Sequence, residues 1–388
     1  MKNILFICGN MEIGGVQKSL VSLLQHFDYR KYNVDLLLFA PEGPLMRYIP
    51  SEVNLVQSGI DSSYYKNFKN SLRELCRKRK YGLATRRIVG TFISVFNKGQ
   101  GFVFTNKVFP KLVKYYDAAI DYGGQLMLYY LVDKVNANVK ISYFHNDYKK
   151  WNYYEKTDRK YYKYVNDIVT VSDECVTSMK KVFPEYQDKI YCIENIIDGD
   201  TTRIEPDTPM PNDNFNGIRI VTIGRVCEQK GFDFAVQVAS RLILAGYEFR
   251  WYWVGPYSND DPWVKKVAQD NNLKSYFILV GGLSNPYGYM TSADIYVQPA
   301  RFEGKSIAIE EAKVLNIPIV TTNFSTVKNQ ITNDQMGIVC DINVDSIEKG
   351  VVELINNQAR REDIRRYLKD NCHGNGDEVK KLYRLIEE

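Results

Sequence analysis

The chain has 388 residues, of which 45% are hydrophobic and 25% charged, a composition typical of a soluble globular protein with room for two domains. Its seven cysteines are scattered and form no C-x-x-C pair, which excludes a disulfide scaffold and indicates reduced thiols in an intracellular protein. No apolar run approaches the about 20 residues of a membrane span. The net charge is +5, and the first half of the chain carries the basic excess.

The first predicted elements are a strand, a glycine-bearing loop and a helix. Residues 4–8 form an apolar run typical of a buried parallel strand, and residues 16–27 have the apolar spacing of a helix. The loop between them ends in Gly14-Gly15 but lacks the G-x-G-x-x-G fingerprint. The pattern predicts the first unit of a doubly wound domain, and the glycine pair either approaches a phosphate or only makes a turn.

Between residues 64 and 109 the pattern is helical and basic, with predicted interruptions at Gly82 and at Gly99-Gln-Gly101. Residues 66–87 hold nine basic residues against one acidic residue, Glu74. A basic amphipathic helix can lie on an anionic bilayer, or its charges can form a solvated face on the domain. Both interpretations stay open. The cations predicted to contact a membrane or an acceptor are Arg77, Lys78, Arg79 and Lys80.

More strands are predicted in the first half at residues 34–39, 53–55, 117–122, 139–144, 167–172 and 189–197. His145 follows the carboxyl end of one of them, which is the side where doubly wound sheets bind ligands. A lone histidine is more often a structural hydrogen-bonding residue than a catalyst. With three histidines in the chain, a metal cluster is not expected.

Residues 149–164 mix lysine, tyrosine and tryptophan, a combination that can bind single-stranded nucleic acid, a glycan or a lipid diphosphate. An amphipathic helix with buried tyrosines is the preferred interpretation. Nucleic acid is the least favoured partner, because the basic residues are local and the second half is acidic. Residues 198–216 are predicted to be a linker, in which turn chemistry explains Asp198-Gly-Asp200 better than metal binding.

The second half repeats the pattern, with strands predicted at residues 218–223, 249–255, 276–282, 295–297, 317–323 and 337–340. The first of these runs into Gly224-Arg225, and Lys230 follows five residues later. Two cations that leave the end of a strand together could neutralise a diphosphate without a metal, or they could be ordinary surface charges.

The strand at 295–297 leads through a turn at Glu303-Gly304 into a helix that is predicted to begin near Ser306. A strand, a glycine turn and a helix N-terminus together form an anion site, because free N–H groups and the positive helix end meet there. Glu303 and Glu311 lie beside this site. Carboxylates repel phosphate, so we expect them to bind hydroxyls, as a nucleotide-sugar would require.

The sequence E-G-K-S-I-A-I-E-E-A, with its E-x7-E spacing, and G-R-x5-G with a lysine before the second glycine resemble the retaining, GT-B-fold glycosyltransferases of family 4. The resemblance is strong over residues 218–340 and looser over 1–200. It implies an α/β GT-B protein with two doubly wound Rossmann-like domains facing across a cleft. Residues 1–205 would bind the acceptor and residues 206–370 the donor, and a helix in 371–388 would pack back toward the first domain.

The resemblance also implies residue roles. By this resemblance, Arg225 and Lys230 would stabilise the leaving group. Glu303 would bind sugar hydroxyls and Glu311 ribose hydroxyls, and His145 would lie near the donor sugar. The other residues expected to bind the donor are Gly15, Gly224, Gly281, Gly282, Gly304, Lys305, Ser306 and Ile307. Lys305 stands where similar enzymes usually have phenylalanine or a small residue.

The implied reaction is a retaining, metal-independent transfer of a hexose or N-acetylhexosamine from a nucleotide-sugar, with a UDP-sugar favoured and no cofactor. The expected acceptor is a glycan, in particular one linked to polyprenyl diphosphate, in bacterial surface polysaccharides such as capsule. The expected location is cytoplasmic and peripheral, at the inner face of the membrane. Two alternatives stay open: a non-catalytic GT-B partner subunit and a GT-B nucleotide-sugar epimerase.

Overall fold

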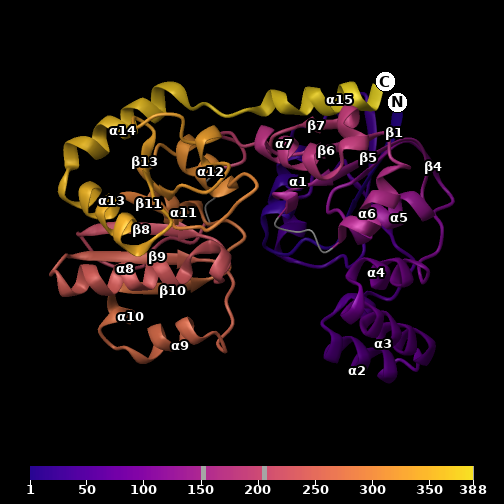
Figure 1. Ribbon diagram of the computed structural model, residues 1–388, viewed down its shortest axis with the longest axis horizontal. Coiled ribbons are helices and arrows are strands. Elements are labelled where there is room, and N and C mark those ends of the chain that lie inside the picture. The colour runs from indigo at the N-terminus through magenta and orange to yellow at the C-terminus, as the bar shows by residue number, and fades with distance from the viewer. Residues whose placement is uncertain (150–153, 203–207, 388) are drawn as a thin grey trace. The chain divides into compact units, whose positions relative to one another are not determined.

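The structure, a computed structural model, describes residues 1–149, 154–202 and 208–387. Its contacts divide the chain into two compact units (Figure 1). Unit 1 comprises Met1–Asn195 and Asp377–Glu388, and unit 2 comprises Ile196–Gly376. The boundary that the sequence suggests after residue 205 lies outside the described residues, and the acceptor and donor roles of the two domains stay predictions.

Unit 1 is built on a parallel sheet that has seven strands among the described residues, in the order β3-β2-β1-β4-β5-β6-β7. The strands are β1 (Lys2–Cys8), β2 (Tyr32–Leu38), β3 (Asn54–Gln57), β4 (Tyr115–Asp121), β5 (Asn136–Phe144), β6 (Asp167–Thr170) and β7 (Ile190–Cys192). The chain order reverses between β1 and β4. In doubly wound folds this switch point is where ligands bind, outside the carboxyl ends of the strands.

Helices connect these strands. They are α1 (Gly15–Gln25), α2 (Phe68–Arg77), α3 (Tyr81–Phe96), α4 (Lys98–Asn106), α5 (Leu126–Lys134), α6 (Glu155–Tyr162) and α7 (Asp173–Val182). The chain returns to unit 1 at its end through α15 (Val379–Glu387). Tyr383 of α15 stacks on Tyr32 with ring centroids 5.1 Å apart, and its hydroxyl accepts a hydrogen bond from the Asp28 N–H (2.7 Å).

Unit 2 has a parallel sheet of six described strands in the order β10-β9-β8-β11-β12-β13. The strands are β8 (Ile218–Ile223), β9 (Phe249–Val254), β10 (Phe277–Gly281), β11 (Ile295–Gln298), β12 (Ile319–Thr322) and β13 (Gly337–Cys340). Counted from β8, this is the same strand order as in unit 1, with its reversal between β8 and β11. Both sheets are therefore of the Rossmann type that the sequence predicts.

The helices of unit 2 are α8 (Phe232–Leu244), α9 (Pro262–Gln269), α10 (Leu273–Tyr276), α11 (Tyr287–Thr291), α12 (Ile307–Val314), α13 (Val344–Asn356) and α14 (Gln358–Asn371). Separate apolar clusters pack on β8 and its neighbours, and Trp251 and Trp253 of β9 are fully buried in one of them. Such continuous apolar strands need cover on both faces, which explains why the sequence pattern locates them well.

The strands predicted from the sequence are confirmed, with shifted ends. The two helix breaks predicted at Gly82 and at Gly99–Gly101 exist, but each lies a few residues earlier in the chain. Gly82 lies in the first turn of α3, and both later glycines lie inside α4, where they allow close packing. A Cβ on Gly101 would lie 1.9 Å from Ser94 Oγ. The chain breaks between α2 and α3, where Arg79 adopts a positive φ of 55°, and between α3 and α4 at Asn97, whose backbone is extended.

Two further expectations concern polar segments. The tyrosine-rich stretch 149–164 lies partly outside the described residues. In its described part Tyr162 is fully buried and Tyr164 is 62% exposed, as the amphipathic interpretation predicts. Asp198 Oδ1 accepts the N–H groups of Asp200 and Thr201, which is turn chemistry. None of the described helices combines the length and apolar character needed to cross a bilayer.

Candidate functional site

The loops that follow β8 and β11 meet at the switch point of unit 2. Residues Glu228–Lys230 form a short 3₁₀ turn, which Gly231 ends at a φ of +70°. The Arg301 N–H donates to the Gln229 carbonyl (2.8 Å), and the Gln229 side chain donates to the Phe302 carbonyl (3.2 Å). These bonds fix the two loops against each other, so the side chains that they carry are held in place.

Lys230 and Glu303 form an ion pair across this junction. The Glu303 side chain is buried, with 8% of its surface exposed, and the Lys230 side chain is 20% exposed. Gln298, the last residue of β11, donates to the same carboxylate oxygen (3.2 Å). Tyr296 in turn donates to the Gln298 side-chain carbonyl, which fixes the orientation of that amide. The cation is therefore held in a defined position at the carboxyl edge of the sheet.

The glycine at the end of β8 leaves room for the lysine. A Cβ on Gly224 would lie 3.3 Å from Lys230 Cδ, so a larger residue would crowd the lysine side chain. Arg225 follows it and is exposed. Within residues 1–149, 154–202 and 208–387, its guanidinium has no hydrogen-bond or ion-pair partner. Two cations therefore follow β8: Lys230 is held in place by Glu303, and Arg225 is exposed.

Helix α12 begins at the predicted place, with Ser306 as its N-cap residue. The Ser306 N–H donates to Gln330 Oε1 (2.9 Å), so this amide is already engaged. The Ser306 hydroxyl is buried and has no hydrogen-bond partner among the described residues. An anion at this helix end would therefore meet the Ser306 hydroxyl and the next amide, that of Ile307, rather than the Ser306 amide.

Glu311 lies farther along α12 and is nearly inaccessible, with 1% of its surface exposed. It accepts a hydrogen bond from the Tyr287 hydroxyl of α11 (2.7 Å). A ribose that reached Glu311 would have to join or displace this bond. Lys305 is also buried, with 9% of its surface exposed. Its neighbours Gly304 and Ser306 belong to the same turn.

Gly281 ends β10, two strands away from β8 at the same carboxyl edge, and Gly282 follows it. Gly281 adopts a φ of +89° at an irregularity in the β9–β10 pairing. Its carbonyl accepts the Gly255 N–H (2.8 Å). Among the predicted site residues of unit 2, Lys230 thus pairs with Glu303 and lies against Gly224, and Gly281 and Gly282 lie at the same edge of the sheet.

Gly15 and His145 belong to unit 1, at its own switch point. Gly15 begins α1 and is exposed. His145 follows β5, and its Nε2 lies 3.1 Å from the Tyr122 carbonyl. Because a carbonyl only accepts, Nε2 carries the proton in this arrangement. Burial lowers the pKa of His145 to about 4, so the ring is neutral near pH 7.

A chain of polar side chains surrounds this histidine. The Ser19 hydroxyl of α1 donates to Asn195 Oδ1 (2.5 Å) and lies 2.7 Å from the Tyr122 hydroxyl. The Tyr122 ring packs against the His145 ring with centroids 4.7 Å apart. Ser19, Tyr122 and Asn195 are not among the residues predicted from the sequence, nor are Gln298 and Gln330 of unit 2. Of these residues, only Gln298 is marked in the sequence, as a polar residue that ends an apolar strand.

The basic segment of unit 1 is only partly available for binding. Lys78 and Lys80 both form ion pairs with Asp61, at 2.9 and 2.8 Å. Lys80, then Ser63 and Lys78, hold the pKa of Asp61 below its usual range. Arg77 and Arg79 are exposed and have no acidic partner among the described residues. Of the four predicted membrane or acceptor cations, two are therefore engaged within the protein.

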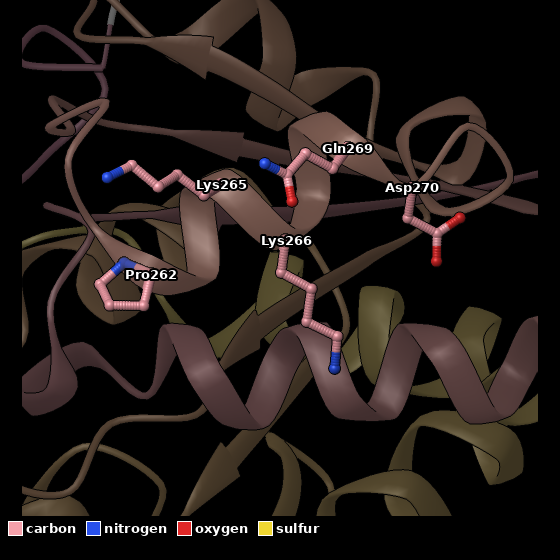
Figure 2. Close-up of a pocket in the computed structure, with 5 residues that line it drawn as sticks. All are labelled: Pro262, Lys265, Lys266, Gln269 and Asp270. Carbon is pink, nitrogen blue, oxygen red and sulfur yellow. The ribbon is translucent and has the colours of Figure 1, made fainter.

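An open surface hollow of about 520 Å³ lies on α9 and is lined by Pro262, Lys265, Lys266, Gln269 and Asp270 (Figure 2). Figure 2 shows the Lys265 and Lys266 side chains pointing in different directions. The lining of this hollow includes none of the candidate site residues described above. No group of three or more potential metal ligands gathers anywhere in the described parts of the chain.

Residues 211–371 match the family model of glycosyl transferases group 1. The capsular polysaccharide biosynthesis glycosyltransferase CapM of Staphylococcus aureus is 25% identical over 158 residues, which are 39% of this chain and 40% of CapM. An uncharacterized protein in the cps region of Klebsiella pneumoniae is 23% identical over 54% of this chain and 57% of its own. The chain thus spans about half the length of the curated relatives it matches.

Solved structures resemble the whole chain. HepE of Anabaena, in complex with UDP and glucose, superposes with a TM-score of 0.71 at 11% identity over 100% of both chains. WaaG, a glycosyltransferase involved in lipopolysaccharide biosynthesis, gives a TM-score of 0.63 at 14% identity over 99% of both chains. At these identities the likeness concerns the fold, which is that of the GT-B glycosyltransferases, with two Rossmann-like domains.

Proposed function

We propose that the protein transfers a sugar from a nucleotide-sugar to a glycan acceptor, and the match of residues 211–371 to the family model of glycosyl transferases group 1 supports this. The observation that carries the proposal is the Lys230–Glu303 pair at the switch point of unit 2. A half-buried, oriented cation beside a helix N-terminus suits a diphosphate, and the carboxylate beside it suits sugar hydroxyls. HepE and TarM of Staphylococcus aureus, which have the same fold, were crystallised with UDP.

In the proposed reaction, Lys230 stabilises the departing diphosphate. Its ammonium has three N–H donors, so it can bind a phosphate oxygen while it keeps its bond to Glu303. Arg225 and the Ile307 amide would add donors to the same diphosphate, and the Ser306 hydroxyl would add one at the helix end. The donor role of Gly15, which belongs to unit 1, stays a prediction. Such preorganised stabilisation of leaving-group charge is worth about 100- to 1,000-fold in rate per donor.

The proposed stereochemistry is retention. No described side chain at the switch point of unit 2 is placed as a nucleophile, because Glu303 is held by Lys230 and Gln298. In a front-face transfer, the bond from the anomeric carbon to the phosphate oxygen breaks, and the bond to the acceptor oxygen forms on the same face. The acceptor proton passes to a donor phosphate oxygen. This scheme uses no metal and no cofactor, and Lys230 and Arg225 supply the positive charge.

The finer assignments belong to the same proposal. Glu303 would bind the hydroxyls of a hexose or N-acetylhexosamine, Glu311 those of the ribose, and Gly281 and Gly282 would approach the base, with uracil favoured. Gly224, Gly304 and Lys305 would shape the donor loop. The proposed acceptor is a glycan on polyprenyl diphosphate in surface polysaccharide synthesis, used by a cytoplasmic enzyme at the inner membrane face. The CapM relative and the cps-region relative support this setting.

Donor turnover tests the proposal. Nucleotide release is measured with UDP-, GDP-, ADP- and dTDP-sugars, with and without EDTA, for the wild type, Lys230→Met, Glu303→Gln and the control Lys265→Met. We expect release from one donor class, unchanged by EDTA, lowered about 100-fold or more in the first two variants and unchanged in the control. Release that requires a divalent metal would contradict the metal-independent scheme. Absence of both release and nucleotide binding would instead favour a non-catalytic partner subunit.

A further inference from the structure

Helices α2 and α3 form a hairpin whose own core is small. Tyr64, Leu75 and Ala84 are its buried apolar residues. In Figure 1 the hairpin lies beyond α4, on the side away from the sheet of unit 1. Its surfaces are therefore not needed to cover that sheet, and their composition calls for another explanation.

Helix α3 packs inward through its small residues. Gly90 is buried, and a Cβ there would lie 3.1 Å from Thr105 Oγ1 of α4. Ser94 meets Gly101 of α4 on the same side, and its hydroxyl donates back to the Gly90 carbonyl (2.8 Å). Small residues let the two helices approach closely, but they leave the large apolar side chains of α3 without a place in this contact.

Those large side chains face outward. Ile88 is 50% exposed, Phe92 63%, and Val95 and Phe96 each 77%. Positions 88, 92 and 95–96 follow the helical repeat and share one face. A surface helix of a soluble protein normally turns its apolar face to the core and its polar face to water. On α3 this polarity is inverted, and a continuous exposed apolar face of this kind marks an interaction site.

Exposed cations are spread over the same hairpin. Lys69, Arg73 and Arg77 are spaced by four residues and so form one exposed stripe along α2. Arg79 and Arg86 are also exposed. None of these five cations has an acidic partner among the described residues, in contrast to Lys78 and Lys80.

We propose that the α2–α3 hairpin docks the protein on an anionic lipid bilayer. The outward face of α3 enters the interface between headgroups and acyl chains, and the five cations lie against the anionic headgroups. Charge complementarity selects this occupant. A symmetric dimer through the same face would bring the same cations of two copies close together. The inference rests on the proposed function only in that a lipid-linked acceptor would be met at such a surface.

The test is co-sedimentation with vesicles of equimolar phosphatidylcholine and phosphatidylglycerol, compared with phosphatidylcholine alone. The variants are Phe92→Ser with Phe96→Ser, and Lys69→Ser with Arg73→Ser and Arg77→Ser. The control is Leu244→Ser, which removes an apolar side chain that is 88% exposed on α8 of unit 2. All changed side chains are exposed, so an unchanged unfolding midpoint verifies that each variant is folded.

We expect the wild type and the control to bind the anionic vesicles, and the wild type to bind phosphatidylcholine more weakly. The phenylalanine variant should lose about tenfold in affinity or more, because the apolar area that it could bury is gone. The lysine–arginine variant should lose affinity chiefly at low salt. Nucleotide release from the donor in solution should be unchanged in both.

The inference would be overturned if the phenylalanine variant bound the anionic vesicles as tightly as the wild type, or if the wild type bound no vesicles. Either result would leave the proposed function intact. A wild-type dimer that this variant converts to a monomer would assign the face to a second copy of the chain and would also overturn it. Vesicle binding without nucleotide release from any donor would contradict the proposed function instead and would leave the docking surface standing.

Discussion

Lys230 and Glu303 are 73 positions apart in the chain and form an ion pair in the structure. The sequence predicts both residues through the spacing of their motifs, because each follows a strand and lies beside a glycine. It does not predict their contact, since that depends on β8 and β11 being neighbours at the switch point. It also does not predict that Gln298 orients Glu303. The sequence shows Gln298 as a polar residue that ends an apolar strand, and this does not reveal which group its side chain holds.

His145 provides a prediction at the residue scale. Its pKa is lowered to about 4 because burial penalises the charged ring, so His145 stays neutral between pH 5 and 8. We expect His145→Asn to lower sugar transfer without moving either limb of the pH–rate profile in that range. The neutral ring also contributes stability that is present above the ordinary histidine pKa of about 6.5 and is lost as the pH falls toward about 4.

A proton NMR titration of the three histidine rings measures this directly, with His145→Asn identifying the signal. One ring should titrate near pH 4. If the His145 signal titrates near 6.5, or if the variant removes an ionisation from the pH–rate profile between pH 5 and 8, the neutral, buried role of His145 is wrong.

At the scale of elements, glycine has two opposite uses in this chain, and the sequence does not distinguish them. Gly99 and Gly101 look like helix breakers but lie within α4, where they let Thr157 and α3 approach. Gly231 ends a turn at a φ of +70° and is the N-cap residue of α8. Which use applies depends on the neighbouring helix or strand, and that information is in the tertiary structure.

Gly231 and Gly246 lie at the two ends of α8 and adopt the same backbone conformation, with φ values of +70° and +78°. A Cβ on Gly231 would lie 1.8 Å from the Pro299 carbonyl oxygen, whereas a Cβ on Gly246 has open space. Gly246→Ala should therefore cost about 1–2 kcal/mol in unfolding free energy, from the left-handed backbone alone. Gly231→Ala should cost about 3 kcal/mol or more, because the loop must also move away from β11.

Chemical denaturation measures both costs, and nucleotide binding measures a second consequence. Lys230 precedes Gly231, so a displaced loop should weaken donor binding in Gly231→Ala but not in Gly246→Ala. Equal stability of the two variants, or undiminished donor binding in Gly231→Ala, would show that the loop contact with Pro299 does not position the lysine.

At the scale of the whole molecule, the sequence predicts two Rossmann-type sheets correctly because buried parallel strands produce apolar runs that few other elements share. The inverted polarity of α3 was not predicted, because its apolar residues read equally well as a face turned to a core. Only the exposed fractions of Phe92 and Phe96 separate these interpretations. The basic segment is also interrupted at Arg79. On either side of this break Lys78 and Lys80 pair with Asp61, which lies outside the segment, so these two lysines are not available to a binding partner.

The central claim is that the switch point of unit 2 holds a nucleoside diphosphate through Lys230. Calorimetric titration of the full chain with the diphosphate and the monophosphate of the preferred base tests it most directly. The wild type should bind the diphosphate about tenfold more tightly or better, since an ordered cation adds about 1.5–3 kcal/mol through a charge-assisted bond. Lys230→Met should lose about tenfold of this preference, with Arg225 and the helix end keeping the remainder, and Lys265→Met should behave as the wild type. An undiminished preference for the diphosphate in Lys230→Met would contradict the account.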